Sequence, residues 1–115
     1  MSILKVNSLQ PANAGSEDYF LARAWCNFVG TNGSVNGSGN VSSVTDFGAS
    51  RFQVSYASAL STANHSVTSN TSNTAYNYFF GSDVYLWSTT YCQVRTHDYN
   101  SLQDVSTVFV TAHAT

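Results

Sequence analysis

The sequence predicts an all-β domain, an antiparallel β-sandwich of jelly-roll-like type with a short extended N-terminal arm. Aromatic residues make up 14% of the chain and there is a single proline, a balance that favours strands over helices. Short segments alternate apolar and polar residues, and Gly, Asn and Ser separate them at close spacing. Several such strands between turn signals are typical of a sandwich, and 115 residues suffice for one domain.

From residue 19 onward we predict strands over 19–29, 40–47, 51–57, 65–70, 74–80, 83–88, 90–97 and 105–113. The stretch 22–48 contains two of these strands, joined by a loop that holds two Asn-Gly pairs. Asn-Gly favours a tight turn because both residues tolerate positive φ. Segment 51–57 alternates cleanly and places Phe52, Val54 and Tyr56 on the face that we expect to be buried.

The last predicted strand is apolar on both faces. Its two alternating sets are Val108, Val110 and Ala112 on one face and Thr107, Phe109 and Thr111 on the other. Both faces are partly apolar, so we expect the core to cover one of them and a partner to cover the other. Together with the sparse charge, this pattern predicts a homotrimer, because a closed cyclic assembly buries such a face without leaving a growing edge.

The first 18 residues are expected to form an arm outside the sandwich domain of residues 19–115. The β-prone run in this arm consists of Ile3, Leu4, Lys5 and Val6. A strand this short is not stable alone and would gain order by pairing with another chain. We therefore predict that these four residues attach the protein to a partner.

Charge is scarce in this chain. Only 9% of the residues are charged and the formal net charge is -2, whereas about a quarter of a typical soluble domain is charged. A surface of hydroxyls and amides suits a protein that packs against neighbours or is exposed outside a cell. The four basic residues cannot neutralise a run of phosphates, so nucleic-acid binding is not expected. With no signal peptide and no long apolar run, we expect synthesis in a host cytoplasm without membrane insertion.

Catalytic and metal-binding patterns are not recognisable. Cys26 and Cys92 are expected to be reduced, inert core thiols on separate strands. His65, His97 and His113 lie on three segments without ligand spacing, so we expect neither a metal site nor a cofactor. No pair of carboxylates and no Gly-x-Ser-x-Gly motif nominates a catalytic residue, and we do not expect an enzyme.

Aromatic residues are the candidates for a recognition surface or a subunit interface. They are Trp25, Tyr76, Tyr78, Phe80, Tyr85, Trp87 and Phe109. Tyr and Trp provide rigid, amphipathic contact area and are enriched at interfaces. Alternate members of an aromatic-rich stretch can equally fill a core, so core packing, subunit contact and ligand contact all stay open at this point.

Two motifs resemble a known family. Residues 24–28 read Ala-Trp-Cys-Asn-Phe, and after a Gly-rich turn residues 40–46 read Asn-Val-Ser-Ser-Val-Thr-Asp. With the opening segment 3–10, they resemble the tail-fibre-type β-domain of tailed-phage, cyanophage-like virion surface proteins. Cys26 stands where the family usually has a β-branched residue, and Phe47 replaces a polar turn residue. The resemblance covers residues 3–65 and implies a virion surface location, a trimeric β-sandwich and no catalytic residue.

Two functions follow from this resemblance and from the chain's organisation. The first is a trimeric capsid decoration (cement) protein, which binds the major capsid protein and staples capsomers together, since the chain has an arm but no coiled-coil or collagen-like shaft. The alternative is a receptor-binding tip or small subunit of a phage tail fibre, with other tail-fibre proteins as partners and a host surface glycan as ligand. Both functions need a sparsely charged trimeric sandwich on the virion surface, so the sequence does not separate them.

Overall fold

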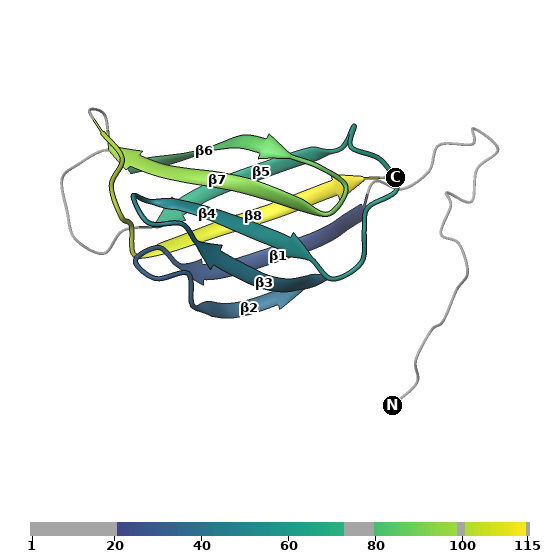
Figure 1. The fold of residues 1–115 in the computed structure, drawn as a ribbon, viewed down its shortest axis with the longest axis horizontal. Coiled ribbons are helices and arrows are strands. Elements are labelled where there is room, and N and C mark those ends of the chain that lie inside the picture. The colour runs from purple at the N-terminus through teal and green to yellow at the C-terminus, as the bar shows by residue number, and fades with distance from the viewer. Residues whose placement is uncertain (1–20, 73–79, 99–100, 115) are drawn as a thin grey trace.

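The computed structural model describes residues 21–72, 80–98 and 101–114. Within them, two four-stranded antiparallel sheets pack as a sandwich, which confirms the predicted fold class (Figure 1). The strands are β1 (Leu21–Val29), β2 (Val35–Gly39), β3 (Val41–Asp46), β4 (Arg51–Tyr56), β5 (Ser66–Ser72), β6 (Phe80–Trp87), β7 (Tyr91–Asp98) and β8 (Thr107–Ala114). The first sheet has the strand order β2-β1-β8-β5 and the second sheet β3-β4-β7-β6. No helix among the described residues is long and apolar enough to cross a membrane.

The core lies between the sheets, and strand alternation supplies its side chains. Phe28 of β1 and Phe52 of β4 are fully buried with ring centroids 5.0 Å apart, so they join the two sheets. The other fully buried side chains are Val54, Val94, Val105, Val108, Thr96, Cys26 and Cys92. Burying a Val or Phe side chain stabilises a fold by roughly 1.5–3 kcal/mol, so this layer holds the sheets together.

The predicted alternation is confirmed in two strands. Phe52, Val54 and Tyr56 of β4 are buried, whereas the residues between them face outward. In β8 the side chains of Val108, Val110 and Ala112 are buried. Phe109, on the opposite face of the strand, is 39% exposed. Strand ends agree with the predicted ranges to within a few residues.

Some predictions fall on residues that the structure does not describe. The arm of residues 1–18, including Ile3 to Val6, lies outside the described residues. The predicted strand 74–80 also lies outside them, except for Phe80, which begins β6.

β2 occupies residues 35–39, which the sequence predicts to be part of a loop, and that prediction is wrong. The first Asn-Gly pair does make a turn, since Gly33 has a φ of 78° and the Val29 N–H donates to the Ser34 carbonyl at 2.8 Å. The second pair lies inside β2. There the backbone ladder to β1 and the cover of a neighbouring aromatic ring override the turn preference of Asn and Gly.

Asn40 turns the chain from the first sheet to the second. Its φ of 53° lies in the left-handed region, which Asn tolerates better than most residues. The Nδ2 atom donates to the carbonyls of Arg23 at 2.9 Å and of Ser58 at 3.1 Å, and Oδ1 accepts the Ser58 N–H at 2.7 Å. This one side chain therefore connects β1, the β2–β3 corner and the segment that follows β4.

The sandwich begins and ends at the same end of the molecule. Leu21 at the start of β1 pairs with Ala114 at the end of β8 (Figure 1). On the side formed by β5 and β6, the Ser69 and Ser82 hydroxyls lie 2.8 Å apart and connect the two edge strands. The first and the last described strand residues therefore lie side by side at this end of the sandwich.

We predict that Asn40→Gly lowers the free energy of unfolding by about 1–3 kcal/mol, because side-chain hydrogen bonds are lost while the left-handed backbone stays accessible. Asn40→Ala should cost about 1 kcal/mol more, because its Cβ is strained at this φ and no side-chain bond compensates. Urea denaturation of both variants measures these two effects separately. Equal stability of the two variants would contradict the role assigned to the backbone conformation.

Candidate functional site

The described candidate aromatic residues are divided between the two sheets of the sandwich. Trp25 of β1 and Phe109 of β8 belong to the first sheet, with exposed fractions of 47% and 39%. Tyr85 and Trp87 belong to β6, an edge strand of the second sheet. Tyr76 and Tyr78 lie outside the described residues. The structure therefore does not gather the nominated aromatic residues into one site.

The outer face of the first sheet, here called the Trp25 face, is built by the register of four strands. Trp25 lies between Gly39 of β2 and Thr111 of β8 in one row, and in the next row Asn27 lies between Gly37 and Phe109. The face consists of Ala22, Trp25, Asn27, Val29, Gly37, Gly39, Ser66, Thr68, Asn70, Ser72, Thr107, Phe109, Thr111 and His113. None of these described positions is Lys, Arg, Asp or Glu, so the face offers hydroxyls, amides, one imidazole, two aromatic rings and the aliphatic side chains of Ala22 and Val29. Arg23, at the bulge between Ala22 and Ala24, is exposed beside this face.

The indole of Trp25 covers the two glycines of β2. A Cβ added to Gly39 would lie 2.3 Å from the indole Nε1, and one added to Gly37 would lie 3.4 Å from Cη2. The indole thus occupies the space that side chains would fill at these positions. Its other side faces solvent, which leaves Trp25 about half exposed. Because Gly37 and Gly39 have no Cβ atoms, the indole can lie flat over β2. We call this half-exposed indole the aromatic platform.

Polar groups surround the platform. The Asn36 Nδ2 donates to the Asn27 Oδ1 at 3.1 Å, which fixes the orientation of the Asn27 amide. Among the described residues, no acceptor is found for the Nδ2 of Asn27. The Thr68 hydroxyl is directed to the Thr111 carbonyl at 3.5 Å. The platform is therefore flanked by ordered amide and hydroxyl groups that are available to solvent.

The outer face of the second sheet, here called the Arg95 face, carries an ion pair between Arg95 and Asp83. The Arg95 guanidinium donates to both carboxylate oxygens of Asp83 and stacks over the Tyr85 ring, 4.7 Å from its centroid. The hydrogen bond to Asp83 is the main cause that raises the pKa of Arg95. Beside this cluster, the Gln93 Nε2 donates to Gln53 at 2.9 Å. These groups satisfy one another and form no acid–base pair poised for catalysis.

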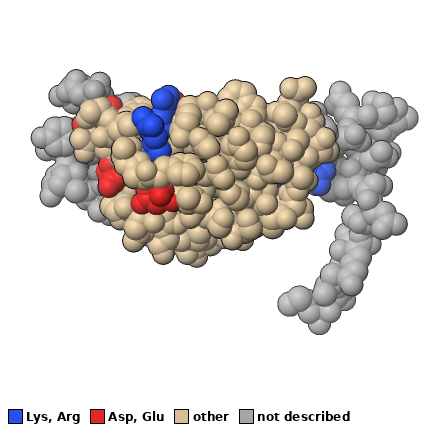
Figure 2. Space-filling model, viewed as in Figure 1, with Lys and Arg blue, Asp and Glu red and all other residues tan. Residues whose placement is uncertain are grey.

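Charge is also unevenly distributed along the molecule. Figure 2 shows that most of the charged side chains visible in that view gather near its left end, whereas a broad middle region has none. At the strand level, Arg51 of β4 is the direct partner of Arg95 of β7, and Asp83 of β6 is the partner of Arg95 on its other side. The charged groups are therefore concentrated in one cross-strand cluster.

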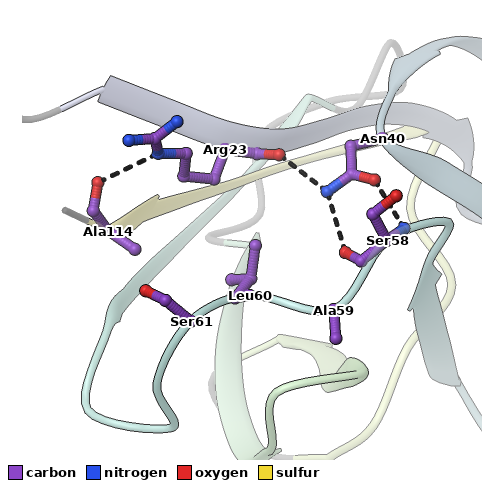
Figure 3. A pocket seen from close by; sticks show the side chains of 7 residues that line it. All are labelled: Arg23, Asn40, Ser58, Ala59, Leu60, Ser61 and Ala114. Atoms are coloured by element: carbon purple, nitrogen blue, oxygen red, sulfur yellow. Dashed lines mark hydrogen bonds between the residues drawn. The ribbon is translucent and has the colours of Figure 1, made fainter. Parts of the chain in front are cut away.

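An open hollow of about 520 Å³ lies at the end of the sandwich where the start of β1 pairs with the end of β8. Its described lining consists of Arg23, Asn40, Ser58, Ala59, Leu60, Ser61 and Ala114 (Figure 3). The Arg23 Nε donates to the Ala114 carbonyl at 3.4 Å, across the mouth of the hollow. Neither a histidine nor a carboxylate side chain is present in this described lining.

The histidines are separate from one another. His65 lies before β5 with its Nδ1 2.8 Å from the Thr62 carbonyl, and His113 is exposed on β8. His97 of β7 lies with its Nε2 3.9 Å from an Asp83 oxygen, a proximity that a bulge in β6 creates and that sequence spacing did not indicate. Within the described part of the chain, no group of three or more His, Cys, Asp or Glu side chains could hold a metal ion.

Cys26 of β1 and Cys92 of β7 are buried and unpaired, as predicted. Burial raises the pKa of each thiol from its ordinary value of 9.0 to about 11, and for Cys26 the neighbouring Cys92 adds to the rise. The Tyr56 hydroxyl beside Cys92 works in the opposite direction and is the smaller effect. Both thiols stay protonated at neutral pH and are poor nucleophiles.

No protein-family model matches this chain, and no curated protein or solved structure shows significant similarity to it. The resemblance to the tail-fibre-type β-domain therefore rests on the sequence motifs alone and stays a prediction.

We predict that the free energy of unfolding falls as the pH rises from 9 to 11, because both thiol pKa values are raised to about 11 in the folded state. The folded protein holds these protons at a pH where the unfolded chain has released them, so stability present below pH 9 is lost. The loss is on the order of 2–3 kcal/mol per thiol. Urea denaturation at several pH values measures it.

The matched control for this pH dependence is the double variant Cys26→Ala/Cys92→Ala. Its stability should depend less steeply on pH between 9 and 11. Burial also raises the pKa of Tyr56, which leaves a residual slope in the variant at the upper end of this range. Parallel curves for the wild type and the double variant would show that the thiols do not cause the loss.

Proposed function

We propose that this chain is a non-enzymatic structural protein of a phage virion surface, a trimeric capsid decoration protein that binds the major capsid protein and stabilises the shell. The observation that carries the proposal is that the described sandwich begins and ends at the same end of the molecule. Leu21 and Ala114 pair at one end of the sandwich, so the described strands join the residues that precede them in the sequence at that end. An arm at one end can attach to a shell while the faces stay available for other contacts.

The chemistry of the described residues supports a binding role over a catalytic one. The thiols are buried and protonated, the Asp83 and Arg95 charges neutralise each other, and the described lining of the hollow holds neither a histidine nor a carboxylate side chain. What the surface does offer is exposed aromatic and apolar area on both sheets, and the paired rows of the first sheet carry no Lys, Arg, Asp or Glu among the described residues. Such area is typical of surfaces that contact a partner.

For the trimer contact we assign the end of β6. Leu86 and Trp87 are adjacent there, with exposed fractions of 43% and 50%, on an edge strand of the second sheet. Leu86 is the cross-strand partner of Gln93 and shares its outer face, whereas Trp87 is the partner of the buried Cys92 and lies on the other side of the edge strand, so the proposed contact covers both sides of that edge. Around a three-fold axis, two large apolar side chains on an edge strand would be covered by the neighbouring protomer without leaving a growing edge.

We predict that deletion of residues 2–18 leaves a folded sandwich that no longer decorates particles. The core side chains belong to the described strands, so thermal unfolding monitored by circular dichroism should stay cooperative. Electron microscopy of particles mixed with full-length or truncated protein measures decoration. Particles without the protein should also break at a lower temperature or under milder osmotic stress. Binding of the truncated protein to capsids would refute the role of the arm.

We predict that Trp87→Ala converts the trimer into monomers, because the largest exposed apolar side chain of the proposed contact is removed. Light scattering coupled to size-exclusion chromatography measures the molar mass. Trp25→Ala is the matched control, since it removes a tryptophan of nearly equal exposure from the opposite sheet, and this variant should stay trimeric. A wild-type protein that is monomeric at high concentration and on particles would contradict the proposal.

The second candidate function is a receptor-binding tip or small subunit of a phage tail fibre that recognises a host surface glycan. The Trp25 face favours this candidate, because it exposes an aromatic platform within a layer of amides and hydroxyls. Microscopy that places the protein on the tail instead of the capsid would select this candidate over the first.

A further inference from the structure

We infer that the Trp25 face is a binding site for a neutral saccharide, with one sugar ring stacked on the solvent side of the Trp25 indole. The inference deepens the second candidate function and rests on it for its biological meaning. Its test uses the purified chain, so its outcome is independent of whether the protein lies on a capsid or on a tail.

The platform is the first step of the argument. Trp25 has one side against the backbone of β2, at the positions where Gly39 and Gly37 lack side chains, and its other side open to solvent. Such a ring is held in one orientation by the strand below it, so little freedom is lost when a ligand stacks on it. The apolar C–H faces of a sugar ring match a flat, half-exposed aromatic surface.

The chemistry around the platform is the second step. The neighbours of Trp25 in the register are Asn27, Thr111 and Thr68, which offer amide and hydroxyl groups. The Asn27 amide is oriented by its bond with Asn36 and keeps its own Nδ2 available among the described residues. Sugar hydroxyls both donate and accept, so they can replace the water that solvates these groups.

The absence of charge on this face selects the class of saccharide. None of its described positions is Lys, Arg, Asp or Glu, and the described arginine next to it along β1, Arg23, is directed to the Ala114 carbonyl. Among the described cations only Arg23, exposed at the bulge two residues before Trp25, lies beside this face. A sialylated, sulfated or phosphorylated glycan would therefore have at most one cation to pair with there, whereas a neutral glycan needs none.

A second copy of this chain is a poorer occupant of the same face. Trp25 and Phe109 are not directly opposed in the sheet, because Trp25 pairs with Thr111 and Phe109 pairs with Asn27. A dry protein interface over these rows would have to desolvate the amide and hydroxyl groups between the rings, at about 1–3 kcal/mol for each group left unpaired. A polyhydroxylated ligand keeps those groups hydrogen-bonded.

The test uses a fluorescence signal that arises from one residue. The chain has two tryptophans, so in the Trp87→Phe variant the emission reports on Trp25 alone. We expect a saturable change in emission, and protection from quenching by acrylamide, when neutral gluco-, galacto-, manno- or N-acetylglucosamine trisaccharides are added. A sialylated trisaccharide serves as the charged comparison and should bind more weakly than the best neutral one.

The variants separate the platform from general stability. Trp25→Ala should weaken binding at least about tenfold in calorimetry, whereas Trp87→Ala should leave the affinity of each site unchanged, because calorimetry with a soluble trisaccharide does not depend on the number of linked sites. Gly39→Ala should also weaken binding, because its Cβ would lie 2.3 Å from the indole and must lift the ring, whereas Gly37→Ala adds a Cβ at 3.4 Å and should be tolerated. Circular dichroism checks that each variant is folded.

Three results would overturn the inference. One is a failure of every neutral trisaccharide to bind the folded wild-type chain. Another is binding that Trp25→Ala does not weaken, or that favours the sialylated sugar. The third is a wild type that binds no sugar and whose trimer dissociates on Trp25→Ala, which would assign this face to a second copy of the chain.

Discussion

The contact between Phe28 and Phe52 is the constraint on which the rest of the structure depends. These rings lie 5.0 Å apart, one on each sheet, and both are fully buried. Because side chains on a strand alternate, burying these two fixes which face of β1 and of β4 points inward. On β1 the same alternation sends Trp25 and Asn27 outward. A slip of one residue would bury the polar row and expose the core, so the core contact also determines the outer face.

The two outer faces differ because the strands distribute their polar residues differently. In the second sheet, Arg51 and Arg95 are direct cross-strand partners, an arrangement that costs energy unless a counter-charge is near. Asp83 supplies that counter-charge from β6, and its bidentate geometry with Arg95 suits the planar guanidinium. The first sheet has no pair of like charges in its paired rows, and Trp25 and Phe109 on its outer face stay exposed to solvent. The charged groups of the second sheet, in contrast, interact with one another.

Much of the fold could be predicted from the sequence, because alternation over segments such as 51–57 is a local property. Phe52, Val54 and Tyr56 were correctly assigned to the core for that reason. β2 was missed because its Gly and Asn residues favour turns, and its strand conformation comes from pairing with β1. The ion pair of Asp83 with Arg95 could not be predicted either, since it depends on a bulge between Val84 and Leu86 that shifts the register.

The candidate site was predictable only in its residue type. Trp25 was nominated as core, interface or ligand contact, and nothing local to β1 decides among these. The structure excludes the core position, because Trp25 is 47% exposed. Gly37 and Gly39 on a neighbouring strand account for where its ring lies, because glycine in a strand is unfavourable unless something approaches its backbone closely. Here the indole makes that approach, within 2.3 Å of where a Gly39 Cβ would lie. Gly37 and Gly39 weaken β2 as a strand, but they leave the space that the Trp25 indole occupies. A local departure from strand preference that creates an exposed, oriented ring is the kind of conflict that marks a functional surface.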